Sequence, residues 1–377
     1  MPGLLADVDP DGLLEYSVVY TDRAVNHMSA KFQHTMCDIH ATLKEVYGAA
    51  DAVVIPGSGT FGMEAVARQF ATNKKTLVLR NGWFSFRWTQ IFEMGDIPSS
   101  SMVLKASKTG PGKHDPFAPA ALEEVVTAIN NEKPDLVFAP HVETSAGMIL
   151  PDDYIKAVCD ATHANGGMFV LDCIASGAIW VDMQETGVDV LISAPQKGWS
   201  GSPCAGLVML SERAGEALQN SNSSSFAVDL KKWHDIMHAY VGGAHAYHAT
   251  MPTDGLTQFR DVMLETKQAG FANVKNAQVE LGQRVRALLA ENNFDSVAAP
   301  GFEAPGVVVC YTDDPDLKTG KKFAAHGLQI AAGVPLQCDE GDDFQSFRIG
   351  LFGLDKLQNV DRSVGSFENA LKNVIAA

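Results

Sequence analysis

Between about residues 45 and 210, short apolar runs alternate with longer stretches in which hydrophobic positions recur at helical spacing. The apolar runs show no polar alternation and are rich in valine, isoleucine, leucine and phenylalanine, which is typical of strands buried on both faces. They are residues 51–56, 75–80, 135–140, 167–173 and 189–195, and helical stretches between them include 116–131 and 151–165. The alternation predicts an α/β fold with a mainly parallel central sheet sandwiched by helices.

After about residue 256 the pattern changes. A long helical stretch, residues 256–293, precedes two β-like runs at 306–312 and 346–352, and charged helical stretches close the chain. We therefore expect two domains. Residues 1–255 would form a large α/β domain with an N-terminal segment, and residues 256–377 a connecting helix and a small α+β domain.

Composition narrows the function classes. The chain has 377 residues, 46% of them hydrophobic and 20% charged, with a formal net charge of −16. This charge argues against a nucleic-acid or anionic-membrane partner, because phosphates would be repelled overall. No apolar run is long enough to span a bilayer, and the first residues carry no cationic signal region, so we expect a cytoplasmic protein. The six cysteines form no C-x-x-C pair, which favours buried free thiols over disulfides or a zinc site.

A glycine-rich loop follows the first apolar run. Its spacing, G-x-G-x-x-G over residues 57–62, is that of a dinucleotide-binding turn, but no acidic residue closes the next strand to bind a ribose. Arg80 stands there instead, which leaves an NADP site open as an alternative, beside a glycine turn that binds nothing. The interpretation we favour is a phosphate held by backbone N–H groups and by the hydroxyls of Ser58 and Thr60 at a helix N-terminus.

Two later residues favour one cofactor. Asp172 ends one apolar run, and Lys197 follows the next in a turn rich in glycine and serine. Taken singly, they are consistent with a turn aspartate and a solvated lysine. Together with a phosphate-binding loop, they are what pyridoxal phosphate requires: a carboxylate for the pyridine nitrogen and a desolvated amine for a Schiff base.

At this point the chain resembles the class V aminotransferases of pyridoxal-phosphate fold type I, close to the alanine–glyoxylate and serine–glyoxylate enzymes. The resemblance covers roughly residues 25–355 and rests on ordered motifs, among them "PGSGTFGMEA", "RNGWFSFRW", "HVETSAG", "LDCIAS" and "SAPQKGWSG". It implies that the following residues hold the cofactor within one chain: Ser58, Gly59, Thr60, Phe84, Thr144, Asp172, Ile174, Gln196 and Lys197. Phe84 and Ile174 would face the two sides of the ring, and Lys197 and Asp172 would be catalytic.

Two further motifs imply contacts beyond the cofactor pocket of one chain. "YHATMP" resembles a segment whose Tyr247 and Thr250 reach the phosphate of a neighbouring subunit, which implies a homodimer with shared active sites. "FRIGLFG" implies that Arg348 binds the substrate carboxylate, for which its planar fork is suited. The resemblance thus predicts ping-pong transamination between a small amino acid and glyoxylate or pyruvate through a Schiff base on Lys197.

Other functions remain as alternatives. Within the class these are a 2-aminoethylphosphonate–pyruvate transaminase and a desulfurase-like lyase, the latter disfavoured because Gln196 replaces the histidine usual before the lysine. Outside it are an NADP-dependent oxidoreductase and a catalytically silent binding protein. Two departures from the family pattern, at residues 9–23 and in "SPCAG" (202–206), affect the expected substrate pocket. No metal site is predicted, because the histidines at 234, 238, 245 and 248 lack a nearby glutamate or cysteine partner.

Overall fold

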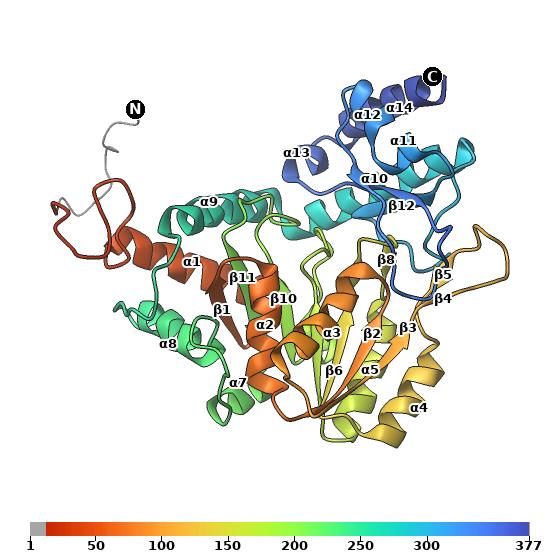
Figure 1. The fold of residues 1–377 in the computed structure, drawn as a ribbon. Coiled ribbons are helices and arrows are strands. Elements are labelled where there is room, and N and C mark those ends of the chain that lie inside the picture. Colours follow the sequence, from red (N-terminus) through yellow and green to blue (C-terminus); the bar gives the residue numbers. More distant parts are fainter. Residues whose placement is uncertain (1–12, 377) are drawn as a thin grey trace.

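The computed structural model describes residues 13–376, and its largest sheet has seven strands in the order β1-β11-β10-β9-β6-β2-β3 (Figure 1). Strand β11 is antiparallel to both of its neighbours, β1 and β10. The five strands from β10 to β3 in this order are parallel to one another. The strands are β1 (Asp51–Pro56), β2 (Lys75–Arg80), β3 (Ser100–Lys105), β6 (Leu136–Pro140), β9 (Met168–Asp172), β10 (Val190–Ser193) and β11 (Ala205–Leu210). The predicted α/β fold with a mainly parallel sheet is therefore confirmed, although β3 and β11 were not among the expected strands.

Helices cover this sheet and fill the crossovers between its strands (Figure 1). They are α1 (Ala30–Tyr47), α2 (Gly59–Phe70), α3 (Trp83–Gly95), α4 (Leu122–Glu132), α5 (Asp152–Ala164), α6 (Met183–Thr186), α7 (Glu212–Gln219) and α8 (Leu230–Val241). The expected helix at 116–131 begins only at Leu122. Residues before it form the short strand β5 (Phe117–Ala118), which pairs with β4 (Ser107–Lys108).

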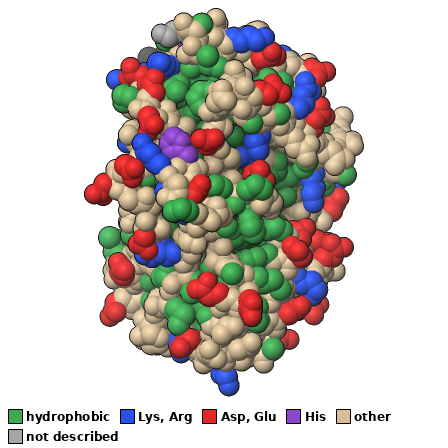
Figure 2. Space-filling view, turned by 90° about the vertical axis from the view of Figure 1, so that its right-hand side faces the viewer, with side chains coloured by type: hydrophobic (Ala, Val, Ile, Leu, Met, Phe, Trp, Pro, Cys, Tyr) green, Lys and Arg blue, Asp and Glu red, His purple; other side chains and the backbone are tan. Residues whose placement is uncertain are grey.

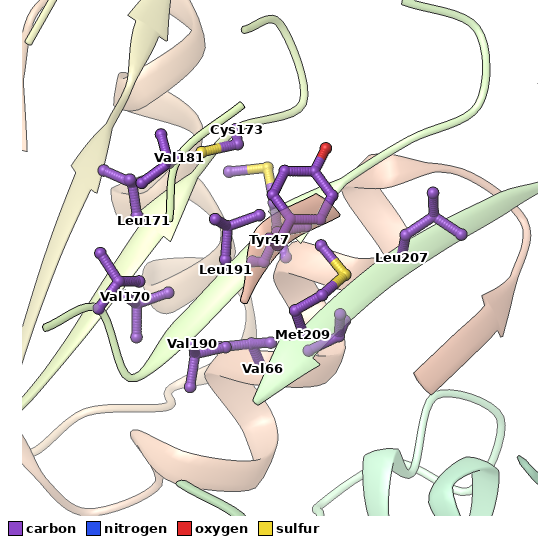
Figure 3. Packing of buried hydrophobic residues seen from close by; sticks show 14 of the residues in the cluster. Tyr47, Val66, Val170, Leu171, Cys173, Val181, Val190, Leu191, Leu207 and Met209 are labelled. Carbon is purple, nitrogen blue, oxygen red and sulfur yellow. The ribbon is translucent and has the colours of Figure 1, made fainter. Parts of the chain in front are cut away.

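The core between sheet and helices is apolar and closely packed. Figure 3 shows Tyr47 of α1 and Val66 of α2 among side chains of β9, β10 and β11. Tyr47 is buried, and its hydroxyl donates to the Ser193 hydroxyl at 3.1 Å, so the one polar atom that this ring brings into the core is satisfied. Burial on this scale is the main force that holds the strand ends in fixed positions.

The C-terminal part is built on two helices rather than one. The expected helix over 256–293 is divided at Gly270, whose φ of 89° ends α9 (Thr253–Ala269) before α10 (Phe271–Glu291) begins. A three-stranded sheet follows, in the order β12-β14-β13. The remaining elements are β7 (Val142–Glu143), β8 (Met148–Ile149), β12 (Val307–Tyr311), β13 (Ala331–Ala332), β14 (Ser346–Gly350), α11 (Pro315–Lys318), α12 (Lys321–Ala325), α13 (Leu354–Leu357) and α14 (Val360–Ala376).

Acidic side chains are common on the surface (Figure 2), in line with the negative net charge of the sequence. Figure 2 shows the face at the right of Figure 1, where acidic side chains are spread around a central strip of hydrophobic ones. Among the described helices, none is both long enough and apolar enough to cross a membrane. All six cysteines are free, and five of them are buried, as the sequence predicts.

The direction of the strands determines where a site can form. Strands β1, β2, β6, β9 and β10 all run the same way, so their carboxyl ends meet at one edge of the sheet. The loops after these ends begin at Gly57, Asn81, His141, Cys173 and Ala194. Ligands of open α/β sheets bind at this edge, and every segment predicted to hold the cofactor within one chain follows one of these strands or ends it.

The glycine at position 206 controls how closely the loop after β1 approaches β11. A Cβ on Gly206 would lie 2.8 Å from both the Gly62 nitrogen and the Ser58 oxygen, which are backbone atoms that cannot rotate away. We expect Gly206→Ala to lower the free energy of unfolding by about 1–3 kcal/mol, as overpacking does in other cores. Urea unfolding measures this change.

Gly215→Ala is the matched control, because Gly215 lies within helix α7 and a Cβ there would meet nothing within 4 Å. We expect this variant to gain about 0.5–1 kcal/mol, since alanine loses less entropy than glycine in a helix. Equal effects of the two substitutions would contradict the packing explanation.

Candidate active site

A cavity of about 180 Å³ opens at the carboxyl edge of the large sheet. It is lined by Ser58, Gly59, Thr60, Met63, Phe84, Arg87, Pro140, Val142, Thr144, Asp172, Ile174, Ala175, Gln196 and Lys197. The structure thus brings together the whole group of residues that the sequence predicts to hold the cofactor within one chain. Their individual roles remain predictions.

The loop after β1 offers an anion site at the N-terminus of α2. Ser58 is the N-cap residue but its side chain makes no capping hydrogen bond, so its hydroxyl remains available to a ligand. A Cβ on Gly59 would lie 2.6 Å from the Ile174 side chain, so only glycine lets the first turn of α2 come this close. Free N–H groups at a helix N-terminus, with the helix dipole behind them, suit a phosphate.

Asp172 is the last residue of β9 and is almost completely buried. Its side chain accepts a hydrogen bond from the Ile174 backbone N–H at 2.9 Å. Burial raises the pKa of Asp172 to about 7, and the Ile174 N–H lowers it only in part. Among the described residues Asp172 forms no ion pair, although the charge of Arg87 also lowers its pKa, and a protonated pyridine nitrogen would provide a direct cationic partner.

Lys197 lies in the turn that follows β10, with its Nζ 5.5 Å from the centre of the Phe352 ring. Burial lowers the pKa of this amine, and the positive charges of Arg348 and Arg87 lower it further. The turn is fixed at its far side by Ser200, which takes up φ 59° and accepts a hydrogen bond from the Leu354 backbone at 2.6 Å. A desolvated amine of lowered pKa is the form that attacks an aldehyde.

The buried groups of this cavity fit pyridoxal phosphate. The Gln196 side-chain oxygen is buried and has no hydrogen-bond partner among the described residues. Together with the uncapped N-terminus of α2 and the buried carboxyl group of Asp172, it gives the cavity polar atoms that a phosphorylated pyridine would satisfy. Phe84 and Ile174 supply apolar surface in the same cavity.

Two residues that sequence reasoning did not single out shape the cavity wall. Arg87 lines the cavity and donates to the Thr60 hydroxyl at 3.0 Å. Glu143 is fully buried, and it accepts hydrogen bonds from the backbone N–H groups of Phe84 and Ser85 at the start of α3. Arg87 belongs to the motif "RNGWFSFRW" and Glu143 to "HVETSAG". A charged residue within each motif was the feature that could have pointed to them.

Arg348 lies on β14 and stands beside the cavity. Its guanidinium is 5.6 Å from the centre of the Phe84 ring, and its Nε donates to the Ala332 carbonyl at 2.7 Å. The small C-terminal sheet therefore brings a cation to the site formed by the large sheet. This position is compatible with the predicted contact to a substrate carboxylate.

Tyr247 and Thr250 lie outside the cavity lining. Their hydroxyl groups are 3.0 Å apart, and Tyr247 is 54% exposed. An exposed aromatic side chain agrees with a role in the site of a neighbouring subunit. That role of Tyr247 and Thr250 stays a prediction.

Among the described residues, neither departure from the family pattern contributes to the cavity lining. Of residues 9–23, positions 9–12 fall outside the described residues, and the Tyr20 hydroxyl donates to the Met251 carbonyl at 3.0 Å. In the "SPCAG" stretch, the Cys204 carbonyl accepts a hydrogen bond from Gly57 at 2.9 Å, which ties this stretch to the glycine loop.

Comparison with known proteins identifies the family. The sequence model of aminotransferase class-V matches residues 13–333. The chain is 29% identical to 2-aminoethylphosphonate–pyruvate transaminase 2 of Paraburkholderia xenovorans, over 91% of this chain and 88% of that protein. It is 27% identical to 2-aminoethylphosphonate–pyruvate transaminase of Vibrio vulnificus, over 85% of this chain and 83% of that protein.

Solved structures agree on the fold. Alanine–glyoxylate aminotransferase from Nostoc superposes with a TM-score of 0.73 at 22% identity, covering 92% of this chain and 89% of that one. Ureidoglycine–glyoxylate aminotransferase from Bacillus subtilis gives a TM-score of 0.73 at 20% identity, covering 92% and 87%. The chain therefore belongs to the class V aminotransferases and is a pyridoxal-phosphate-dependent enzyme of fold type I.

Proposed function

We propose that this enzyme transfers the amino group of a small, negatively charged amine to pyruvate or glyoxylate, in a ping-pong cycle. One observation carries the proposal: Lys197, Asp172 and the glycine loop line one cavity of about 180 Å³, and two arginines stand beside the lysine. This arrangement combines a nucleophilic amine, an anion site for the cofactor and positive charge for an acidic substrate.

The cofactor and the residues around it have separate roles. When bound, pyridoxal phosphate supplies an aldehyde that condenses with amines and a ring that accepts the electrons of a deprotonated carbon. Asp172 holds a negative charge where the ring nitrogen would lie and so favours its protonated form. Ser58, Thr60 and Gln196 are placed to bind the phosphate, while Phe84 and Ile174 hold the ring.

Lys197 is proposed to serve twice. It first holds the cofactor through its amine, and once a substrate amine displaces it, Nζ accepts the proton of the substrate Cα and later returns a proton. Its lowered pKa supports this, because a larger fraction of the amine is unprotonated near neutral pH. Arg348 would bind the substrate acid group and orient the Cα–H bond toward Nζ.

The amino donor is proposed to be either a small amino acid or 2-aminoethylphosphonate. Motif resemblance favours an amino acid, whereas the named relatives at 26–29% identity are 2-aminoethylphosphonate–pyruvate transaminases. Both donors carry an acid group that an arginine fork binds, so Arg348 alone does not separate them. The proposed acceptor is glyoxylate or pyruvate for an amino acid, and pyruvate for 2-aminoethylphosphonate, as in the names of these relatives.

The assembly is proposed to be a cytoplasmic homodimer with shared active sites. Exposed apolar side chains support a subunit contact on this part of the molecule: Phe61 follows the glycine loop and is 50% exposed, and Phe226 packs on His248 while it is 76% exposed. Large exposed aromatic side chains are typical of interface positions. Tyr247 and Thr250 would then complete the phosphate site of the partner.

A screen of purified enzyme tests the reaction. Alanine and serine with glyoxylate, and 2-aminoethylphosphonate with pyruvate, are mixed with holoenzyme, and amine transfer is followed by chromatography of the products. We expect transfer from at least one donor. In Lys197→Ala the rate should fall by about 10²–10⁴-fold, the usual contribution of proton transfer by a positioned group.

Lys156→Ala is the control, since Lys156 is exposed and pairs only with Asp160 on its own helix. Its rate should equal that of the wild type. Full activity of Lys197→Ala, or no transfer from any donor, would refute the proposed reaction.

A pH series on the cofactor-free protein tests the state of Asp172. Its folded-state pKa of about 7 lies above the ordinary value of 3.8, so the folded protein binds the extra proton. The free energy of unfolding of the wild type relative to Asp172→Asn should therefore be highest below pH 4. It should fall by about 1.4 kcal/mol per pH unit as the pH rises toward 7.

Urea unfolding of both proteins at pH 5, 6 and 7 gives this difference. Because saturating pyridoxal phosphate should supply a cationic partner, the fall should disappear when the cofactor is added to both proteins. Parallel stability curves without cofactor would show that Asp172 is not desolvated as the structure indicates.

Subunit complementation tests the shared sites. Lys197→Ala and Tyr247→Ala/Thr250→Ala chains are each expected to have low activity as homodimers. Refolded or coexpressed mixtures should recover about a quarter of wild-type activity, because half of the dimers are hybrids and each hybrid has one intact site.

Lys197→Ala mixed with Asp172→Asn serves as the control, since both residues come from the same subunit in each site. That mixture should gain nothing over the average of its parents. Recovery in neither mixture would argue that Tyr247 and Thr250 serve the site of their own chain.

A further inference from the structure

Four side chains converge at the start of β1, at the end of the sheet opposite the cavity. Asp51 begins β1, His40 comes from α1, and His234 and His238 come from α8. The Nε2 atoms of His234 and His238 lie 3.0 and 2.6 Å from Oδ2 of Asp51, and Nε2 of His40 lies 2.8 Å from Oδ1. Five residues of strand, about 17 Å, separate Asp51 from the cavity end of β1.

The sequence did not reveal this group. We predicted no metal site because the histidines between 234 and 248 lack a nearby glutamate or cysteine partner. The fold supplies Asp51 from 183 residues away. His245 and His248 take no part, because His245 lies against the His27 ring and His248 is 2.8 Å from the Phe226 carbonyl.

The spacing of the two helical histidines suits a metal ion. His234 and His238 are one helical turn apart, so both rings leave α8 on the same face, with ring centres 4.3 Å apart. Their Nε2 atoms and a carboxylate oxygen of Asp51 lie within 4.8 Å of one another. Zinc binds His nitrogen and Asp oxygen at about 2.0–2.2 Å, which puts tetrahedral ligand atoms roughly 3.3 Å apart. The present separations of 2.6 and 3.0 Å reach this value by small side-chain movements.

The surroundings of the ligand atoms also suit a metal. A ligating histidine donates its other ring N–H to a carboxylate or carbonyl in most sites. Nδ1 of His234 is buried without a hydrogen-bond partner, and the Asp235 carboxylate lies 3.9 Å from it. With a metal on Nε2, the ring proton moves to Nδ1 and faces this carboxylate. His40 holds the second oxygen of Asp51 and so fixes the orientation of the ligand.

We propose that Asp51, His234 and His238 bind one Zn²⁺ ion per chain, with a water molecule as the fourth ligand. His238 has a side chain 47% exposed, so the position has access to solvent. His40 acts as a positioning residue through Asp51. The ion would join α8 to β1, and through His40 to α1, and it would lie about 17 Å of strand away from the cavity, apart from the chemistry of the cofactor.

Calorimetric titration tests the proposal. Holoenzyme is freed of metal by dialysis against a chelator and titrated with zinc chloride, and Co²⁺ is added in parallel as a spectroscopic probe. We expect one zinc per chain, a visible Co²⁺ band of tetrahedral type, and a higher unfolding temperature with zinc, since a ligand that binds only the native state stabilises it.

The variants separate ligands from bystanders. His238→Gln should weaken zinc binding by about 100-fold or more, because losing even an outer partner of a metal ligand costs about 10–100-fold. His40→Gln should weaken it by about 10-fold. His34→Gln is the matched control, since His34 lies on the same helix α1 and is exposed, and it should bind zinc as the wild type does.

His238→Gln replaces a partly exposed side chain and should keep its fold and the absorbance of its bound cofactor, so a lost signal reports on zinc alone. Asp51→Asn gives a second test from a different element. The proposal is overturned if the wild type binds no zinc at micromolar concentration, or if His238→Gln and Asp51→Asn both bind it with unchanged affinity.

Discussion

Loss of water around Asp172 and Lys197 is the constraint on which the chemistry of this enzyme depends. The two groups stand at the carboxyl ends of adjacent strands, β9 and β10, where helices and the C-terminal sheet exclude solvent. The same burial acts on them in opposite directions, raising the pKa of the acid to about 7 and lowering the pKa of the amine. Both groups are thereby shifted toward their neutral forms. A partner of opposite charge would stabilise the carboxylate, and a reactive partner would combine with the neutral amine. A cofactor with a cationic ring nitrogen and an aldehyde meets both needs at once.

That burial is possible because the backbone around the site approaches unusually closely. Gly59 lets α2 lie against Ile174, and Gly206 lets β11 pass under the glycine loop. The result is a helix N-terminus brought directly to the edge of the sheet, beside the turn that holds Lys197. Close packing and the proposed anion binding therefore both require glycine in this loop. The glycines that resemble a dinucleotide fingerprint meet both requirements.

The sequence predicted most of the buried strands of the large sheet, although β11 was missed despite being buried along its whole length. The five expected strands are continuous apolar runs, four of them inside the sheet and one, β1, at its edge. Strand β3, at the other edge, is only partly buried and begins with two exposed serines, so it does not read as an apolar run. The helix over 256–293 was predicted as one because its apolar spacing runs through Gly270, whose positive φ only the folded chain reveals.

The site shows the same division. The nine residues that the motifs singled out for one chain all line one cavity, since each ends or follows a recognisable strand, and their roles stay predictions. Arg87 and Glu143 were missed because their roles depend on contacts between distant parts of the chain. Glu143, in β7, accepts a hydrogen bond from Ser85 at the start of α3, 58 residues away. The cluster at Asp51 was missed for the same reason, because its proposed ligands come from β1 and α8 and its positioning residue His40 from α1, which only tertiary packing brings together.

Helix α3 connects these observations into one mechanical unit. Glu143 accepts hydrogen bonds from backbone N–H groups in the first turn of α3 and so fixes that turn. Phe84 and Arg87 are thereby held in position at the cavity. Arg87 then reaches across to Thr60 on α2, and the guanidinium of Arg348, from the small sheet, lies 5.6 Å from the centre of the Phe84 ring. The cavity wall is thus held by contacts among loops that follow different strands. A shift of the C-terminal sheet would move Arg348 relative to Phe84 and Lys197, whereas the anion site on α2 would stay in place. With Arg348 as the proposed substrate-binding residue, substrate and cofactor would be bound by different parts of the chain, and the donor preference could change without loss of the cofactor.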